Sequence, residues 1–196
     1  MRHYFWFTIF CCLLLGSEAY ASVAQTDWNV AALQQLLAQV PPRQRLVQVG
    51  DMQIPTVTLQ RWYDHLTGTQ TAKSAFDQYF NAWPNGNVYY TFDVSVSPAH
   101  QKAFLDGAGE WATFANLHFI QRTTEANYVI VTNSVTLDGG VSAVGMVGGP
   151  QLLQIGTITW NRPTICHELG HTLGLVHEHQ RSDRDNYVTI DRKSVV

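Results

Sequence analysis

The sequence predicts an α+β fold in which a mixed, mostly parallel, twisted sheet packs on two long helices. Residues 87–93 (NVYYTFD) alternate in polarity as a half-buried strand does. A capping serine followed by a proline opens an amphipathic helix over 97–116. Residues 118–122 and 128–132 then read as two further strands. The order strand, helix, strand, strand implies a mixed sheet covered by helices.

The chain begins with the pattern of a secretory signal peptide. Arg2 and His3 give a short basic start, residues 4–15 are apolar, and residues 19–21 (AYA) form an A-x-A cleavage box. The apolar run is short for a membrane span. We therefore expect residues 1–21 to be removed and the protein to be secreted, extracellular or periplasmic. The alternative is a retained N-terminal membrane anchor.

Of the three cysteines, Cys11 and Cys12 lie inside this signal, which leaves Cys166 alone. An intramolecular disulfide is then impossible, although a secreted protein would permit one. We expect Cys166 to be a small buried apolar residue of a helix rather than a metal ligand.

Residues 22–82 form a separate segment ahead of the predicted sheet. Asp27 is positioned to cap an amphipathic helix that runs to Val40, where two prolines stop it. Gly50 and Asp51 have the composition of a turn.

The second long helix is expected to start near Asn161 and to carry metal ligands. His167 and His171 are four residues apart, so their side chains lie one above the other and can share one metal ion. Glu168 is rotated away from them and can reach a water on that metal as a general base. A glycine at 174 can end the helix, so that His177 returns as a third ligand.

Three nitrogen ligands leave a fourth position open for water, which is typical of a catalytic zinc site. The complete pattern, H-E-x-x-H-x-x-G-x-x-H, is a known zincin motif. We predict one zinc ion per chain. The alternatives are a helix whose histidines merely share a face, and a zinc site that binds without catalysis.

The residues that follow resemble the signature of the astacin family of metzincin endopeptidases. Residues 177–188 (HEHQRSDRDNYV) match H-E-x-x-R-x-D-R-D-x-Y-V. The resemblance implies that Glu168 is the catalytic base and that the zinc ligands are His167, His171 and His177. It also makes Glu178 the family glutamate that lies near the new N-terminus of the mature enzyme.

The resemblance extends over most of residues 83–190 and implies a division of the chain. Residues 83–86 (WPNG) are similar to the start of mature astacins. Residues 22–82 would then be a pro-segment, and 83–196 would be the N-terminal lobe of a metzincin, zincin-like catalytic domain. In this family an F-x-G-D motif places an aspartate in the open zinc position. Gly50 and Asp51 match it, which makes Asp51 the candidate inhibitory switch, although Gln48 replaces the usual phenylalanine.

The glycine-rich stretch 138–150 would supply the antiparallel edge strand that pairs with an extended substrate in metzincins. Residues 141–147 are the candidate strand, since an unpaired edge offers main-chain groups to varied peptides. A flexible loop is the alternative.

The sequence departs from the family pattern in two ways, in its cysteines and in a missing methionine-containing turn. Without disulfides the chain looks like a bacterial-type relative, and a methionine-containing turn, S-x-M-H-Y, does not occur before Val196. We therefore expect the C-terminal lobe to be missing, which leaves the activity of this chain alone open.

The expected function is a secreted zinc-dependent endopeptidase, made as a zymogen and acting on protein or peptide substrates. The rival is a truncated, catalytically inactive zinc-binding fragment or decoy. The net charge of −3 gives no indication of nucleic-acid binding. No stable membrane association is expected once the signal is removed.

Overall fold

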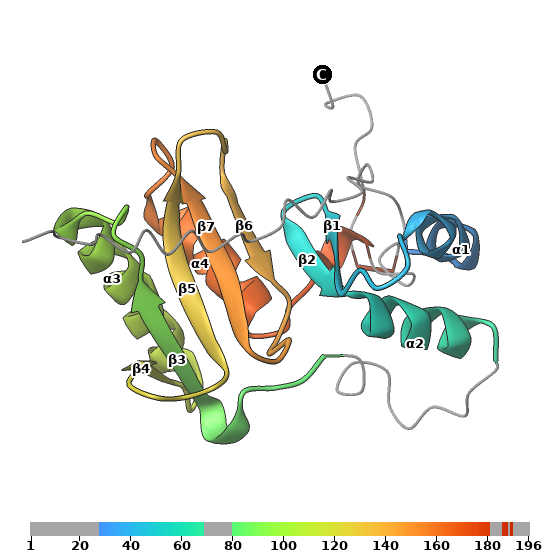
Figure 1. Cartoon of the computed structure of the whole chain (residues 1–196), viewed down its shortest axis with the longest axis horizontal. Helices are drawn as coiled ribbons and strands as arrows, with labels where there is room; N and C mark the ends of the chain where they lie inside the picture. The colour runs from blue at the N-terminus through green and yellow to red at the C-terminus, as the bar shows by residue number, and fades with distance from the viewer. Residues whose placement is uncertain (1–27, 69–79, 181–185, 188, 190–196) are drawn as a thin grey trace, which may run out of the picture.

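The computed structural model describes residues 28–68, 80–180, 186–187 and 189. Its sheet contains seven strands in the order β1-β2-β6-β7-β5-β3-β4 (Figure 1). The strands are β1 Leu46–Val49, β2 Met52–Pro55, β3 Asn87–Phe92, β4 His118–Gln121, β5 Tyr128–Ser134, β6 Gly140–Ala143 and β7 Pro150–Gly156. The α-helices are α1 Val30–Gln39, α2 Thr56–Leu66, α3 Pro98–Phe114 and α4 Arg162–Thr172, and short 3-10 turns cover Pro84–Gly86 and Glu178–Gln180.

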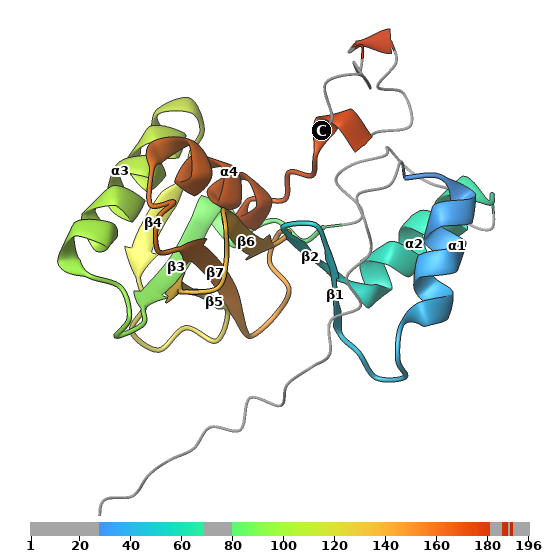
Figure 2. The ribbon, with the colours of Figure 1, turned by 90° about the horizontal axis from the view of Figure 1, so that it is seen from above.

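The strand directions confirm the predicted mixed sheet. Strands β4, β3, β5 and β7 run parallel to one another, and β6 is antiparallel to β7. The antiparallel β1–β2 hairpin joins the sheet through β2, which is parallel to β6. Helices α3 and α4 lie together on one face of the sheet, whereas α1 and α2 lie beside the hairpin (Figure 2). We call residues 28–68 the N-terminal unit and residues 80–180 the C-terminal unit.

The described residues form two hydrophobic clusters, one within the C-terminal unit and one built mainly by the N-terminal unit. In the C-terminal unit, alternate residues of β3 and β5 point inward, and Phe104 of α3 packs against them. Its buried residues are Trp83, Val88, Tyr90, Phe104, Ala108, Val129, Val131, Leu153, Ile155, Ile165 and Leu169. Burial of this apolar surface fixes the sheet under the two helices and so positions α4.

The elements of the C-terminal unit follow from local signals in the sequence. Ser97 caps α3 by accepting a hydrogen bond from the His100 N–H at 3.2 Å, and Pro98 occupies the first turn. Residues 87–92 form β3 as predicted from their alternation. Strand β7, which was not predicted, carries the buried polar residue Gln151 on its inward face, so that its alternation is hidden.

The N-terminal unit departs from prediction in several places. Helix α1 begins at Val30, and Asn29, rather than Asp27, caps it by accepting from the Ala32 N–H at 2.9 Å. Asp27 lies outside the described residues. The hairpin β1–β2 and helix α2 were not predicted, and they pack with α1 around a second cluster that includes a Trp28–Trp62 ring stack at 4.8 Å.

The strand expected to be a free edge is not one. Strand β6 is shorter than the predicted 141–147 and runs antiparallel to β7, but β2 pairs along its other side. The main-chain groups of that side are therefore engaged by the N-terminal unit. Among the described residues, no helix has the length and apolarity needed to cross a membrane.

Candidate metal centre

Helix α4 presents the predicted ligands because its two ends are fixed. Asn161 caps it by accepting from the Thr164 N–H at 3.1 Å, and Pro163 lies in the first turn. At the other end the helix stops at Thr172, and Gly174 has a φ of 105°, a conformation that suits glycine. The chain thereby turns back toward the helix, as predicted.

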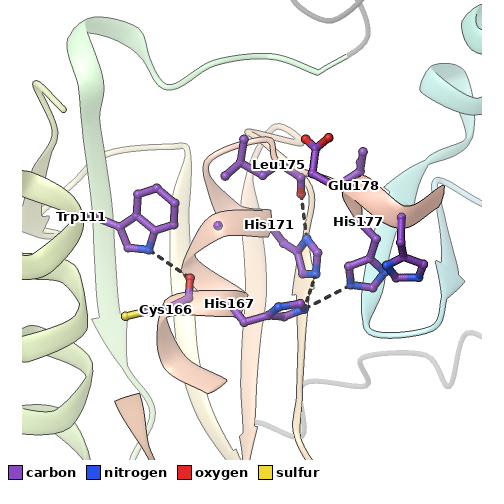
Figure 3. A pocket seen from close by; sticks show the side chains of 10 residues that line it. Trp111, Cys166, His167, His171, Leu175, His177 and Glu178 are labelled. Carbon is purple, nitrogen blue, oxygen red and sulfur yellow. Dashed lines mark hydrogen bonds between the residues drawn. The ribbon is translucent and has the colours of Figure 1, made fainter. Parts of the chain in front are cut away.

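Three histidine rings converge beside this turn (Figure 3). The Nε2 atom of His167 lies 3.0 Å from that of His171 and 3.2 Å from that of His177. His171 and His177 are buried, whereas His167 remains exposed. The structure therefore brings together all three residues that the sequence indicated.

The tautomer of His171 is set by the main chain. Its Nδ1 lies 2.7 Å from the carbonyl oxygen of Leu175, so Nδ1 carries the proton and donates it to that oxygen. The lone pair of Nε2 then faces His167 and His177. This fixing bond was not predicted, because a carbonyl acceptor leaves no signal in the sequence.

A fourth ligand candidate comes from the tip of the β1–β2 hairpin. Gly50 and Asp51 form its two-residue turn, since Val49 pairs with Met52. Gly50 has a φ of 61°, as a tight turn of this kind requires, and the Gln48 side chain donates to its carbonyl at 3.1 Å. The predicted turn is present, and Gln48 supports it.

The Asp51 carboxylate reaches the histidines from this tip. Its Oδ2 lies 3.0 Å from the Nε2 of His167, and its Oδ1 lies 3.1 Å from the Nε2 of His177 and 3.8 Å from that of His171. Two segments that are 116 residues apart in the chain thus meet at one point.

The four side chains fit a tetrahedral metal ion. Their ligand atoms all lie within 4.8 Å of one another, and ligands at ordinary zinc distances are about 3.3 Å apart. If His167 and His177 each donate from Nε2 to an oxygen of Asp51, the lone pair on the Nε2 of His171 still receives no proton from either ring. A cation at the centre would satisfy all of them.

Charge and burial act together on this group. Burial lowers the pKa of His171 to about 4, so the ring is neutral at pH 7, as a metal ligand must be. The hydrogen bond with Asp51 raises the pKa of His167. Burial alone would raise the pKa of Asp51, but the contacts with His167, His177 and His171 outweigh it and lower that pKa far below its usual value.

Glu168 is buried beside the histidines, and only 1 % of it is exposed. Burial, followed by the charge of Asp51, raises its pKa to about 9. Its Oε2 has no hydrogen-bond partner among the described residues. Gly140 at the start of β6 lies so close that a Cβ there would be 2.6 Å from the Oε1 of Glu168. Glu168 is thus held under β6 without being one of the grouped ligands.

Strand β6 is also fastened to α4 by contacts that were not predicted. The hydroxyls of Ser142 and Thr172, both fully buried, are 2.8 Å apart. The Gly145 N–H donates to the carbonyl of His171 at 2.8 Å, and the Trp83 indole donates to that of Thr172 at 2.9 Å. Strand β6, the residues after it and Trp83 thus all contact the end of the histidine-bearing helix.

The remaining site residues lie around a hollow next to the histidines (Figure 3). Cys166 is half-buried rather than buried as expected, and its Sγ lies 3.6 Å from Glu110. Burial raises the pKa of the Cys166 thiol. Glu178 is exposed at the start of a 3-10 turn. Residues 181–185 of the predicted signature lie outside the described residues.

Comparisons with known proteins bear on this centre. A family model described as Astacin, a family of peptidases, matches residues 75–196. Zinc metalloproteinase nas-12 of Caenorhabditis elegans is 28 % identical over 194 residues, which cover 97 % of this chain and 49 % of that protein. Tolloid-like protein 1 of Homo sapiens is 35 % identical over 114 residues, which cover 58 % of this chain and 11 % of that protein. The chain therefore spans about half the length of these relatives or less.

A solved structure shares the arrangement of the elements. High choriolytic enzyme 1 (HCE-1), a hatching enzyme zinc-protease from Oryzias latipes (medaka fish), superposes with a TM-score of 0.53 at 27 % identity. The superposition covers 64 % of each chain.

Proposed function

Since the family model covers more than half of it, the chain belongs to the astacin family, and we propose that it is a secreted zinc-dependent endopeptidase made as a zymogen. The observation that carries this proposal is the convergence of three histidines around one point, with the buried Glu168 beside them. We assign one zinc ion per chain to His167, His171 and His177.

The proposed chemistry divides between the ion and the protein. When bound, zinc supplies a Lewis acid for the attacking water and the scissile carbonyl. Removal of the Asp51 charge and the positive charge of a bound zinc ion would both lower the pKa of Glu168. Glu168 would then be ionised, so that it could take the proton of that water on its carboxylate and pass it to the leaving amine. The position of Glu168 against Gly140 of β6 supports this role. A substrate peptide that took the place of β2 beside β6 would lie close to Glu168.

Latency is proposed to come from residues 22–82, with 83–196 as the catalytic lobe and 1–21 as the signal. Asp51 lies against the histidines, and β2 pairs with the side of β6 that a substrate would need. A carboxylate in the open metal position would exclude the attacking water. Both the metal and the peptide-binding edge would thus be blocked by one hairpin.

Zinc content and casein cleavage test the proposal. We expect residues 82–196, which lack both Asp51 and β2, to bind one zinc ion and to cleave more casein than residues 22–196. Asp51→Ala in residues 22–196 opens only the metal position and should restore part of this cleavage. Adding Glu168→Gln should leave the zinc and lower turnover about 100-fold or more. Because the relatives are longer, the assay is also run on protein extended by any coding sequence that follows.

Each outcome bears on one part of the proposal. Substantial cleavage by Glu168→Gln would refute the base assignment, and latency unchanged by Asp51→Ala would count against the switch. Zinc without cleavage in every form would favour the rival function, an inactive metal-binding fragment. No bound zinc in any form would overturn the metal site itself.

A further inference from the structure

The N-terminal unit holds the C-terminal unit through main-chain bonds made by its hairpin. The Ser142 N–H donates to the carbonyl of Asp51 at 2.9 Å, and the Val144 N–H donates to that of Gln53 at 3.0 Å. These bonds extend the sheet of the C-terminal unit by two strands. Both bonds join the hairpin to β6 and the residue that follows it.

Apolar burial adds an independent contact. Val144 and Val176 belong to the C-terminal unit, yet they are 1 % and 5 % exposed because they lie within the cluster of the N-terminal unit. The other buried members of that cluster are Trp28, Leu33, Leu36, Val47, Val49, Met52, Ile54 and Leu59. Separation of the two units would return both valine side chains to water, so their burial favours the complex.

The N-terminal unit presents these groups from elements that pack against one another. The hairpin is supported by α1 and α2, and the ring stack of Trp28 on Trp62 joins the start of α1 to α2. Its inward-facing residues Leu33, Val47 and Ile54 are completely buried. Most of the residues that form the binding surface are therefore held by contacts within residues 28–68.

We infer that residues 28–68 are a separable inhibitory partner of the catalytic lobe, which stays bound across the β2–β6 pairing after the chain between the two has been cut. This inference rests on the proposed function and extends its regulation. The contacts at β6, at Val144 and Val176, and at Asp51 all lie outside the residues between 68 and 80. Cleavage and release are therefore two events, and the released unit can rebind another copy of the lobe.

The experiment uses residues 22–196 with the recognition sequence of a specific protease placed between Gly68 and Phe80. All forms carry Glu168→Gln, so that no peptidase activity enters the readout. After complete cutting in the presence of zinc, size-exclusion chromatography and native mass spectrometry at micromolar concentration should show the two pieces as a one-to-one complex. Val144→Ala should raise the dissociation constant about tenfold, as should Asp51→Ala.

A matched valine provides the control. Val57 on α2 is 56 % exposed and lies outside the buried cluster, so Val57→Ala should leave the dissociation constant unchanged. Separate elution of the two wild-type pieces would overturn the inference, as would equal affinity of the Val144→Ala, Asp51→Ala and Val57→Ala forms. If the two pieces stay bound but no form cleaves casein in the earlier assay, only the peptidase proposal is refuted.

Discussion

The buried hydroxyl pair of Ser142 and Thr172 joins strand β6 to helix α4. The two oxygens lie 2.8 Å apart, and the Ser142 hydroxyl also donates to the carbonyl of Ala143 at 3.2 Å. Both side chains are fully buried. Water cannot replace a partner that is lost there, so the pair contributes to the stability of the site as well as to its shape.

Thr172→Val tests this contribution, because it removes the hydroxyl and keeps the side-chain volume. We expect the free energy of unfolding to fall by about 1–3 kcal/mol, as measured by denaturant titration. Thr113→Val on the exposed surface of α3 is the control, since the Thr113 hydroxyl donates only to the nearby carbonyl of Glu110 at 2.7 Å. Equal losses for the two variants would contradict a special role for the buried pair.

Some residues of the site could be predicted from the sequence, and others could not. His167, Glu168 and His171 were found because helical spacing is local, so their common placement follows from position alone. Ser142 and Thr172 are 30 residues apart in the chain. No local sequence pattern indicates that this serine and this threonine form a hydrogen bond. Cys166 was misjudged because its exposure depends on how α4 sits beside α3, which a single helix does not determine.

Helices α3 and α4 are in close contact at a glycine of α3. A Cβ on Gly107 would lie 2.7 Å from the Cγ2 of Ile165, which is a fully buried residue of α4. A Cβ on Gly109, two positions later in the same helix, would meet no atom within 4 Å. Both glycines lie inside the same helix, but only Gly107 is packed against another helix.

Replacing each glycine by alanine should therefore have opposite effects. Gly109→Ala should raise the free energy of unfolding by about 0.5–1 kcal/mol, because alanine is the better helix former. Gly107→Ala should lower it by about 1–3 kcal/mol, because the new methyl overpacks the contact with Ile165. Chemical denaturation of the two variants checks both signs, and a stabilised Gly107→Ala form would refute the close-packing interpretation.

Elements with strong local signals were predicted, and elements defined by pairing were not. Capping by Ser97 and Asn161 located α3 and α4, and alternation located β3. These elements predicted a mixed sheet packed on helices, and the resemblance to the astacin family implied a zincin-like fold, which the likeness to the hatching enzyme confirms. Strands β1 and β2 have only four residues each, too few for a periodic pattern to stand out. Strand β7 was missed because Gln151 is buried to hold the Gly145 carbonyl at 2.8 Å.

At the level of the whole molecule, three distant segments meet at the histidine group. Helix α4 brings two rings, the chain beyond Gly174 brings His177, and the hairpin of the N-terminal unit brings Asp51. An ion bound by all three segments would bind the folded state and not the unfolded chain. Bound metal should therefore raise the stability of both units together.

Removing the metal from the zinc-loaded protein tests this coupling. At a free metal concentration about 100 times the dissociation constant, binding contributes about 2.7 kcal/mol, so chelation should lower the melting temperature by about 5–10 °C. His171→Gln should melt lower and should not respond to the chelator, whereas His118→Gln, at an exposed position of β4, should respond like the wild type. A wild-type melting temperature that is insensitive to chelation would mean that the histidines do not join these segments through a metal. A chelator response retained in His171→Gln would place the stabilising ion elsewhere in the chain.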